Sequence, residues 1–240
     1  NCSKFDVIWG DMDNGRTMPT AVWLANKWQK KSYVHGEWFP PYRLFPGYGH
    51  KYNEKTQLEQ RPKYMDNLEA MKKADLVSLS RDTTAGGFDW LEENFGVTFE
   101  NKFIRRPACP IYETKNWTKE NSVATIATYR TGLKRVDHTI EAIAKSKTKP
   151  EFHLIGGPEG MTHPEIKMHS YGMWNTEEKI DIYARSKVAV QHFGGIPEAE
   201  AIQQMCPVIA YDIKYMRQLY GDALVWVPEN DIDALSSAID

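Results

Sequence analysis

The residues best suited to chemistry lie in residues 192–210, where the sequence predicts a strand, a Gly-Gly turn, a helix and a second strand. Pro197 suits the first position of that helix, because its missing N–H would have no partner there in any case. Gly194 and Gly195 let the backbone approach a ligand closely, and the free amides of such a turn and of a helix N-terminus favour an anion such as phosphate. Glu200, about one turn into the helix, would repel a phosphate but could accept hydrogen bonds from sugar hydroxyls. The structural alternative is an ordinary turn followed by a solvent-exposed helix residue.

Two cations occupy a comparable position earlier in the chain. A buried strand is expected to end at Arg130, and Lys134 stands at the start of the next helix. Ligands of open α/β sheets bind beyond the carboxyl ends of the strands, so this pair would suit a diphosphate, with Arg130 able to make paired hydrogen bonds. The alternative is surface charge that serves solubility. The binding hypothesis gains weight because the two cations and the Gly-Gly turn occur in the same half of the chain.

These residues are positioned by strands and helices that alternate along the chain. Strands are expected at residues 6–10, 32–35, 76–80, 102–105, 123–130, 152–156, 166–171, 188–192, 207–211 and 224–227. Helices are expected at residues 19–30, 57–73, 88–94, 136–147, 176–186, 197–205 and 232–239. Strand followed by helix, repeated, predicts βαβ units and an α/β fold with parallel sheets and helices on both faces. A Pro-rich and polar break that begins at residue 107 separates two Rossmann-like domains, which we place at residues 1–115 and 116–240.

Composition is that of an ordinary soluble protein. The 240 residues are 41% hydrophobic and 26% charged, which supplies a core and argues against disorder. A net charge of −2 argues against a general nucleic-acid binder. Cys2, Cys109 and Cys206 stand too far apart for a disulfide framework or a zinc site, so we expect a reducing, cytoplasmic location. No stretch approaches the ~18–20 continuous apolar residues of a membrane span.

Several segments match the motifs of a known family. In the second half they are Tyr129-Arg130 through Lys134-Arg-Val-Asp137, Phe152 to Gly157, Tyr171-Gly-Met-Trp174 with Glu177-Glu178, Glu200-Ala201 with Pro207-Val-Ile-Ala210, and Gly221-Asp222 with residues 227–235. The first half agrees more loosely, at Asp6-Val-Ile8, Tyr33-Val-His35 and Ala74-Asp-Leu-Val77. On these residues the chain resembles the retaining glycosyltransferases of the GT-B fold, family four. The resemblance is specific from about residue 122 onward.

The resemblance implies two Rossmann-like domains that face a cleft. It also implies transfer of a sugar from a nucleotide-diphosphate sugar to an acceptor hydroxyl, with retention of the anomeric configuration. By position, Arg130 and Lys134 would bind the diphosphate and stabilise the charge that develops as it leaves. Glu200 would hold the ribose hydroxyls, and the backbone of Gly194-Gly195-Ile196 would contact the donor sugar or phosphate.

The resemblance assigns the remaining site residues and partners in the same way. His35 would lie across the cleft near the transferred sugar, and Trp174 or its neighbours would pack beside the base. Members of the family need no metal, because cations and backbone amides take the place that a metal has elsewhere, and no other cofactor is expected, since the nucleotide sugar is the donor substrate. The acceptor would be a glycan, a lipid or a small molecule, and no nucleic acid is expected. The end of the first helix, with Trp28, Lys30 and Lys31, could touch a membrane surface, as in some members of the family.

Three departures from the family pattern bear on activity. The family usually carries a second Glu eight positions before the one matched by Glu200, and His192 stands there. Met205-Cys206 stand where the family has a helix glycine, and the Arg-to-Lys spacing is one residue shorter than expected. His192 can still hydrogen-bond a sugar hydroxyl; alternatively, it merely ends a strand. The candidate catalytic residues are therefore His35, His192, Arg130 and Lys134.

Other function classes stay open. The His192 change favours a sugar-nucleotide-binding protein without catalysis, and an enzyme that hydrolyses or epimerises a UDP-sugar would share the fold. A nicotinamide-binding Rossmann protein is disfavoured, since no GxGxxG follows a first strand. The resemblance further implies a strand and a Gly-rich loop before Asp6, and helices after Asp240. We therefore expect the chain to be a fragment or an unusually trimmed member of the fold.

Overall fold

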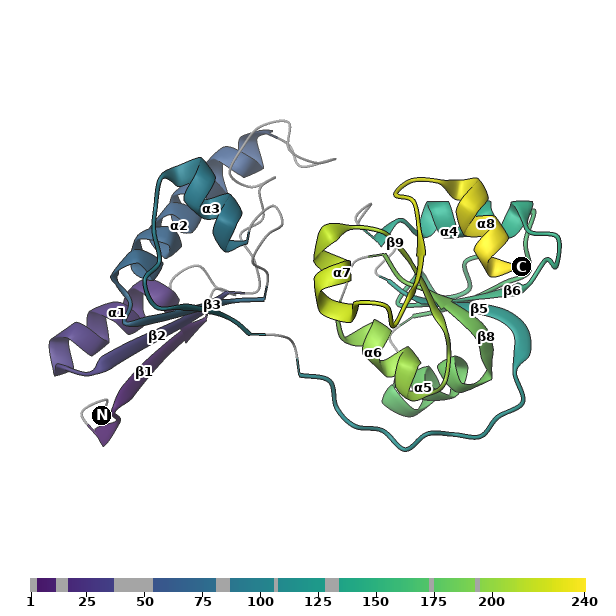
Figure 1. Ribbon diagram of the computed structural model, residues 1–240, viewed down its shortest axis with the longest axis horizontal. Helices are drawn as coiled ribbons and strands as arrows, with labels where there is room; N and C mark the ends of the chain where they lie inside the picture. The colour runs from purple at the N-terminus through teal and green to yellow at the C-terminus, as the bar shows by residue number, and fades with distance from the viewer. Residues whose placement is uncertain are drawn as a thin grey trace. The chain divides into compact units, whose positions relative to one another are not determined.

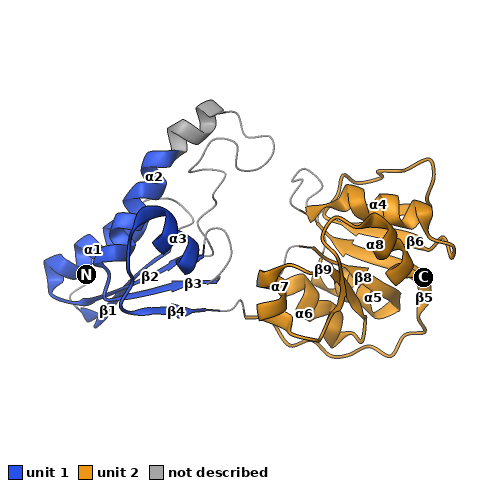
Figure 2. Ribbon diagram, turned by 45° about the horizontal axis from the view of Figure 1, so that its top comes forward, with its two compact units in different colours: residues 1–106 blue, residues 107–240 orange. Residues whose placement is uncertain are grey.

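The computed structural model describes residues 4–11, 17–36, 54–80, 87–105, 108–127, 134–172, 175–192 and 195–240. The chain divides into two compact units, unit 1 with residues 1–106 and unit 2 with residues 107–240 (Figure 2). Residues 108–119, which lie in the expected break between the domains, are part of unit 2. Each unit is built on a parallel sheet, so the predicted α/β fold with two Rossmann-like domains is confirmed.

Unit 1 contains a parallel sheet with its strands in chain order. The strands are β1 (Val7–Asp11), β2 (Lys31–Gly36), β3 (Leu76–Leu79) and β4 (Lys102–Ile104), and the helices are α1 (Thr17–Trp28), α2 (Glu54–Lys73) and α3 (Phe88–Phe95) (Figure 1). Buried side chains from all three helices pack on Val34, Val77 and Leu79 of the sheet. On the other face of the sheet, Trp9 is 58% exposed and Phe103 is 41% exposed. In the described part of unit 1, the helices therefore cover one face of the sheet.

The packing of α1 on β1 depends on Gly10. A Cβ atom at this position would lie 2.7 Å from the Ala21 Cβ and 2.7 Å from the Thr17 carbonyl oxygen. Both distances are too short for non-bonded atoms, so any side chain at Gly10 would push α1 away from the sheet.

Unit 2 contains a larger parallel sheet in the order β10-β9-β8-β5-β6-β7. The strands are β5 (Glu120–Ile126), β6 (Glu151–Ile155), β7 (Met168–Tyr171), β8 (Ser186–Val190), β9 (Val208–Tyr211) and β10 (Val225–Val227). The helices are α4 (Val136–Lys145), α5 (Thr176–Arg185), α6 (Ile196–Gln203), α7 (Lys214–Tyr220) and α8 (Ile232–Ile239). Because the strands run parallel, all their carboxyl ends lie at one edge of the sheet.

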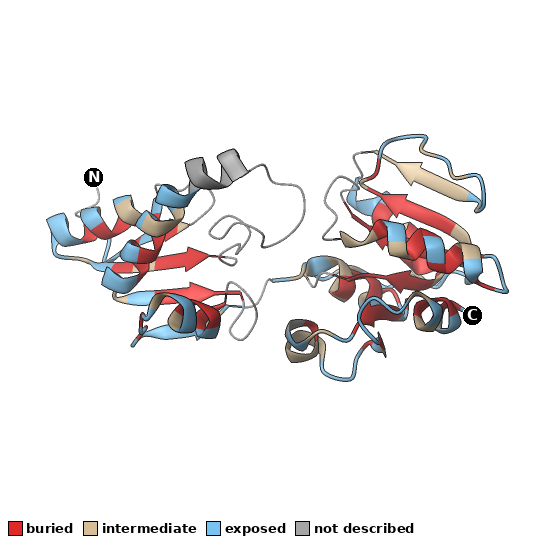
Figure 3. Ribbon diagram, turned by 90° about the horizontal axis from the view of Figure 1, so that it is seen from above, coloured by how far each residue is buried: buried red, intermediate tan, exposed pale blue. Residues whose placement is uncertain are grey.

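Helices cover both faces of the unit 2 sheet, as its apolar strands require. On one face, α4 and α8 bury Ile143 and Leu235 against the sheet, and on the other face α5, α6 and α7 bury Tyr183, Ala201 and Met216. The strands between them are mostly buried (Figure 3). The sheet is therefore a rigid platform from which the loops at its carboxyl edge project.

The alternation of strands and helices predicted from the sequence agrees closely with the described elements. Every described strand lies at an expected position, with bounds that shift by a few residues; β5, for instance, begins at Glu120 rather than at Val123. Of the described helices, α7 alone was not expected. It has only seven residues, too few for a clear helical pattern; among its described side chains Met216 is fully buried, and Leu219 and Tyr220 are partly buried against the same core.

None of the described helices is long and apolar enough to cross a bilayer. The end of α1, where we expected a contact with a membrane surface, carries Trp28, which is 40% exposed. The Lys27 ammonium lies 4.9 Å from the ring centre of Trp23 and 5.9 Å from that of Trp28.

Candidate functional site

The topology of unit 2 singles out one position at the carboxyl edge of its sheet. From β5 the chain proceeds to β6 on one side, and it later returns to β8 on the other side of β5. The order therefore reverses between β5 and β8, and in open α/β sheets the crevice beyond such a switch point binds the ligand. The segments that follow these two strands, residues 127–134 and 191–196, are those that carry most of the residues singled out from the sequence.

Three of the predicted site residues, Arg130, Trp174 and Gly194, lie outside the described residues. Lys134 is described, and it lies half-buried in the turn that leads into α4. The next residue, Arg135, adopts a left-handed backbone conformation with φ 49°. The Arg135 guanidinium lies 2.8 Å from a carboxylate oxygen of Glu229 and 5.5 Å from the ring centre of Tyr211. Sequence reasoning overlooked Arg135, although it stands beside Lys134 in the same basic run.

His192 follows β8 and is 5% exposed. Its ring stacks on Tyr211 with a centroid separation of 4.1 Å and an interplanar angle of 17°. Among the described residues, neither ring nitrogen has a hydrogen-bond partner. Burial, and to a smaller extent the positive charges of His138 and Arg135, lower the pKa of His192 to about 3. The imidazole is therefore neutral at physiological pH, with one donor and one acceptor available to a ligand.

Tyr211, the last residue of β9, links His192 to α4. Its ring packs on the His192 ring, and its hydroxyl lies 2.8 Å from Nδ1 of His138. Burial raises the pKa of Tyr211 to about 12. The phenol is therefore protonated, and it fixes the plane of the His192 ring from one side.

Glu200 lies on α6 and is buried, so the alternative of a solvent-exposed helix residue is wrong. One of its carboxylate oxygens lies 2.5 Å from the ammonium of Lys179 on α5. The side chains of Lys179 and Glu200 are only 9% and 3% exposed. Tyr112 lies close to the pair, with its ring centre 5.9 Å from the Lys179 ammonium. The ion pair with Lys179 thus orients this carboxylate, and the sequence did not indicate that partner.

Gly195 is the N-cap residue of α6, and Ile196 is the first residue of the helix. The Tyr220 hydroxyl donates a hydrogen bond to the Gly195 carbonyl, which fixes the turn. A Cβ atom on Gly195 would meet only the Pro197 Cδ, at an ordinary distance of 3.6 Å, among the described atoms. Packing within the protein therefore does not require glycine here, which leaves room for a close approach of a ligand.

His35 belongs to unit 1, where it lies near the carboxyl end of β2 and is 7% exposed. Its Nδ1 lies 2.6 Å from the Ser78 hydroxyl, which also lies 2.7 Å from the Tyr33 hydroxyl. This bond orients the His35 ring.

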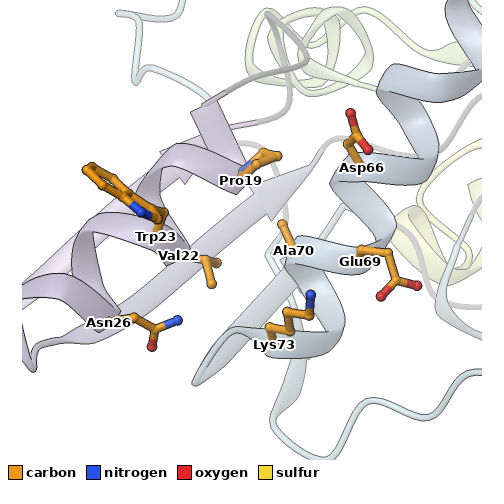
Figure 4. A pocket seen from close by; sticks show the side chains of 8 residues that line it. All are labelled: Pro19, Val22, Trp23, Asn26, Asp66, Glu69, Ala70 and Lys73. Atoms are coloured by element: carbon orange, nitrogen blue, oxygen red, sulfur yellow. The ribbon is translucent and has the colours of Figure 1, made fainter.

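One hollow among the described residues lies away from the carboxyl edges of both sheets. A hollow of about 350 Å³ lies between α1 and α2, with Trp23 on one side and Glu69 and Lys73 on the other (Figure 4). Its lining belongs to the helices and not to the carboxyl edge of the sheet. In the described parts of the chain, no three His, Cys, Asp or Glu side chains are grouped as a metal site would need.

Comparison with known proteins gives matches among solved structures only. No protein-family profile and no curated protein sequence matches the chain. TarM of S. aureus matches with a TM-score of 0.71 and 18% identity, over 97% of this chain and 47% of TarM. HepE of Anabaena, solved in complex with UDP, matches with a TM-score of 0.70 and 13% identity, over 99% of this chain and 69% of HepE.

A third match is WaaB, described as a lipopolysaccharide outer core galactosyltransferase. Its TM-score is 0.65 at 12% identity, over 98% of this chain and 66% of WaaB. The chain spans about half the length of TarM and about two thirds of the length of HepE and WaaB. These matches establish the fold, which is the GT-B fold with its two Rossmann-like domains.

Proposed function

We propose that this protein binds a nucleotide-diphosphate sugar at the carboxyl edge of the unit 2 sheet and transfers the sugar to an acceptor hydroxyl, with retention of the anomeric configuration. The observation that carries the proposal is the convergence at the β5–β8 switch point of Lys134, the Gly195 turn with the N-terminus of α6, and the buried neutral His192. The proposal also draws on HepE and TarM, which have been solved with UDP, and on WaaB, which is described as a galactosyltransferase.

The proposed roles follow from the charge that each part of the donor carries. Arg130 and Lys134 bind the diphosphate, together with the amides at the start of α6, because a helix N-terminus and fixed cations both favour an anion. As the bond between the anomeric carbon and the diphosphate oxygen breaks, negative charge grows on the diphosphate. Preorganised donors and cations stabilise that charge more strongly in the transition state than in the bound donor, and this difference accelerates the reaction.

The remaining roles concern the neutral parts of the donor. Glu200 accepts hydrogen bonds from the ribose hydroxyls, and Trp174 packs beside the base. The Gly194-Gly195-Ile196 backbone contacts the sugar or the phosphate next to it. His35 acts near the transferred sugar from unit 1. No metal or other cofactor takes part in this scheme, because cations and amides compensate the phosphate charge.

His192 decides between the proposed function and a second candidate. A neutral imidazole with two unbonded nitrogens can donate a hydrogen bond to one sugar hydroxyl and accept one from another. It cannot supply the negative charge of the carboxylate that the family has at this position. The second candidate is therefore a protein that binds a sugar nucleotide without turning it over.

A thermal-shift series with UDP-, GDP- and ADP-sugars tests the binding site. A ligand that binds the folded state raises the Tm, because it stabilises that state by RT ln(1 + L/Kd), where L is the ligand concentration. The control is Lys147→Ala, which also removes one exposed cation but at a position beyond α4. We expect sugars of one base class to raise the Tm of the parent protein and of Lys147→Ala by similar amounts. The same sugars should raise the Tm of Arg130→Ala much less. A Tm unchanged by all three classes, or equal shifts in both variants, would contradict the proposal.

Release of nucleoside diphosphate then separates the candidate activities. A transferase releases it only when donor and acceptor are both present, whereas a hydrolase releases it without an acceptor. A protein that only binds the donor gives a thermal shift and no release with any acceptor. An epimerase converts the donor without releasing nucleoside diphosphate.

A further inference from the structure

The turn that follows β6, residues 156–160, has a backbone path that its glycines fix, and we call it the glycine turn. Gly156 and Gly160 have positive φ angles of 91° and 70°, which glycine adopts without strain. A Cβ atom on Gly157 would lie 2.5 Å from the Leu154 Cδ2, too close for non-bonded atoms. Three of the five positions therefore favour glycine, and the sequence sets the path of the turn.

Hydrogen bonds hold the glycine turn against the end of β7. The Ser170 hydroxyl donates to the Pro158 carbonyl at 2.6 Å. The Gly160 N–H donates to the Ser170 carbonyl, and the Gly156 N–H donates to the Tyr171 carbonyl, each at 3.1 Å. The turn is therefore tied to β7 at both of its ends, at the carboxyl edge of the sheet.

Glu159 lies on the glycine turn, and its side chain runs beside Gly172, the first residue after β7. A Cβ atom on Gly172 would lie 3.4 Å from the Glu159 Cβ and 3.5 Å from the Glu159 Oε2. Glu159 is exposed, and among the residues that the structure describes its carboxylate forms no hydrogen bond or ion pair. A carboxylate only accepts hydrogen bonds. A ligand at the end of β7 would therefore meet two acceptor oxygens that the described residues leave free.

Under the proposed function, the base of the donor lies near the Glu159 carboxylate. Glu200 holds the ribose, and its partner Lys179 stands about one turn into α5, which begins at Thr176, shortly after Gly172. The diphosphate, on one side of the ribose, lies at the β5–β8 switch point, which β6 separates from β7. The base is attached to the other side of the ribose, so we expect it at the end of β7.

The bases of nucleotide sugars differ in what they offer to a carboxylate. Guanine has two adjacent donors, N1–H and the exocyclic amine, which match the two oxygens of a carboxylate in a paired arrangement. Uracil has one N–H between two carbonyl oxygens that the carboxylate would repel, and adenine has one amine beside an acceptor nitrogen. Guanine is thus the base that Glu159 fits best. The match to HepE, solved with UDP, has 13% identity and concerns the fold, which does not fix the base.

We propose that Glu159 is the specificity-determining residue for the base: its carboxylate accepts hydrogen bonds from N1–H and the exocyclic amine of guanine, and the donor is a GDP-sugar. This inference rests on the proposed function of the site. The glycine turn supports it, because a fixed backbone lowers the entropy cost of ordering Glu159 on the base. Gly172 supports it as well, since it places no side chain beside the Glu159 Oε2.

The test measures the Kd of GDP, inosine diphosphate (IDP), UDP and ADP by titration calorimetry. IDP differs from GDP only in lacking the exocyclic amine, so the parent should bind GDP about ten- to hundredfold more tightly than IDP, as one hydrogen bond to a charged group requires. UDP and ADP should bind more weakly than GDP. Glu159→Gln replaces one acceptor oxygen with a donor, so it should weaken GDP binding about tenfold or more, bring the Kd values of GDP and IDP within about threefold of each other, and leave UDP binding no weaker.

Glu165→Gln is the matched control, because it removes one exposed carboxylate that lies before β7, at the opposite end of the strand. It should bind all four ligands as the parent does. The inference is overturned if the parent binds UDP or ADP more tightly than GDP, if it binds GDP and IDP equally, or if its preference for GDP survives Glu159→Gln. GDP binding that weakens equally in both variants would show a general effect of charge and would overturn it too. If the parent binds none of the four ligands, the proposed function is overturned as well.

Discussion

The Lys179 ammonium lies 2.5 Å from a carboxylate oxygen of Glu200, and the two residues, on neighbouring helices, are buried together. An ion pair in this environment does not stabilise a protein more than apolar residues of the same shape would, because both charges have lost their hydration. Its importance lies in what happens when one partner is removed. A substitution of Glu200 that is meant to probe ligand binding would therefore also leave the buried charge of Lys179 without a counter-charge.

This relationship predicts a stability cost for the direct test of Glu200. Glu200→Gln should lower the free energy of unfolding by about 3–5 kcal/mol, because it leaves the buried Lys179 without a counter-charge. The double variant Lys179→Met/Glu200→Gln should recover most of that loss. Urea unfolding curves of the parent, the single variant and the double variant measure both effects. Equal unfolding midpoints for the parent and Glu200→Gln would show that the pair is not buried as described. Loss of ribose binding should be measured in the double variant, because its stability should be close to that of the parent.

A second prediction concerns Met205, which stands where the resembling family has glycine. Met205 has φ 53°, and its N–H donates to the Ile202 carbonyl while the Cys206 N–H donates to the Ala201 carbonyl, each at 3.0 Å. This is the Schellman pattern of a helix end, in which the left-handed position favours glycine. Because Met205 is 73% exposed, its side chain contributes little packing to offset the strain.

Met205→Gly should therefore raise the stability of unit 2 by about 1 kcal/mol, the usual cost of a left-handed conformation for a residue with a Cβ. Met205→Ala keeps the Cβ and removes the exposed side chain, so it should not stabilise. Thermal unfolding of both variants separates the two effects. A Tm that rises equally in both, or in neither, would contradict the backbone explanation.

The fold could be predicted from the sequence because its signals are local. Short apolar runs such as residues 123–126 alternate with helical periods such as Val136, Ile140 and Ile143, and the structure buries those three helix residues as expected. The parallel order then brings the ends of β5 and β8 together, so a candidate site at their carboxyl edge also follows from local patterns.

The partners of the site residues could not be predicted, because they are far apart in the chain. Lys179 is 21 residues from Glu200 and lies on another helix. In the sequence it was an ordinary lysine on an amphipathic helix. The pairing of the backbone of residues 110–115 with Gln203 and Gln204 could not be predicted either, since a glutamine at a helix end usually faces water.

Gly195 provides a test in which folding and ligand binding separate. A Cβ on Gly195 would lie 3.6 Å from the Pro197 Cδ, so Gly195→Ala should change the free energy of unfolding by less than about 1 kcal/mol. Under the proposed function the same methyl group would stand between the backbone and the bound donor, and the Kd of the nucleotide sugar should rise at least about tenfold. Gly157→Ala is the converse control, because its Cβ would lie 2.5 Å from the Leu154 Cδ2 and should lower stability instead. If the folded Gly195→Ala protein bound the donor with unchanged affinity, the Gly195 turn would not be part of the donor-binding site.

Removal of metal ions tests how the phosphate charge is neutralised. If Arg130, Lys134 and the α6 amides compensate that charge, an excess of EDTA should leave the Kd of the donor and the rate of nucleoside diphosphate release within about twofold of their values in buffer. Arg130→Ala should lower the rate under both conditions. Loss of activity in EDTA that Mg²⁺ restores would show instead that the donor binds as a metal complex.

The burial of His192 predicts how stability depends on pH. The pKa of His192 is lowered to about 3 in the folded protein, mainly by burial, whereas an unfolded histidine has a pKa near 6.5. Between these values the unfolded chain binds the proton and the folded protein does not. Lowering the pH from 6.5 therefore favours unfolding, by about 1.4 kcal/mol per pH unit for one such group. Positive charge on His138 and Arg135, which face the ring, lowers the pKa of His192 in the same direction.

His192→Asn removes this titration and keeps a polar side chain at the position. The free energy of unfolding of the parent should fall more steeply than that of His192→Asn as the pH decreases from 6.5 to 4.5, while the two curves run parallel above pH 7. His153, whose pKa burial lowers to about 4, titrates in the same window in both proteins, so its contribution cancels in the difference. Urea unfolding at closely spaced pH values gives the two slopes. Identical slopes would mean that His192 is protonated in the folded protein, and a charged imidazole beside the leaving diphosphate would then replace the neutral one in the proposed mechanism.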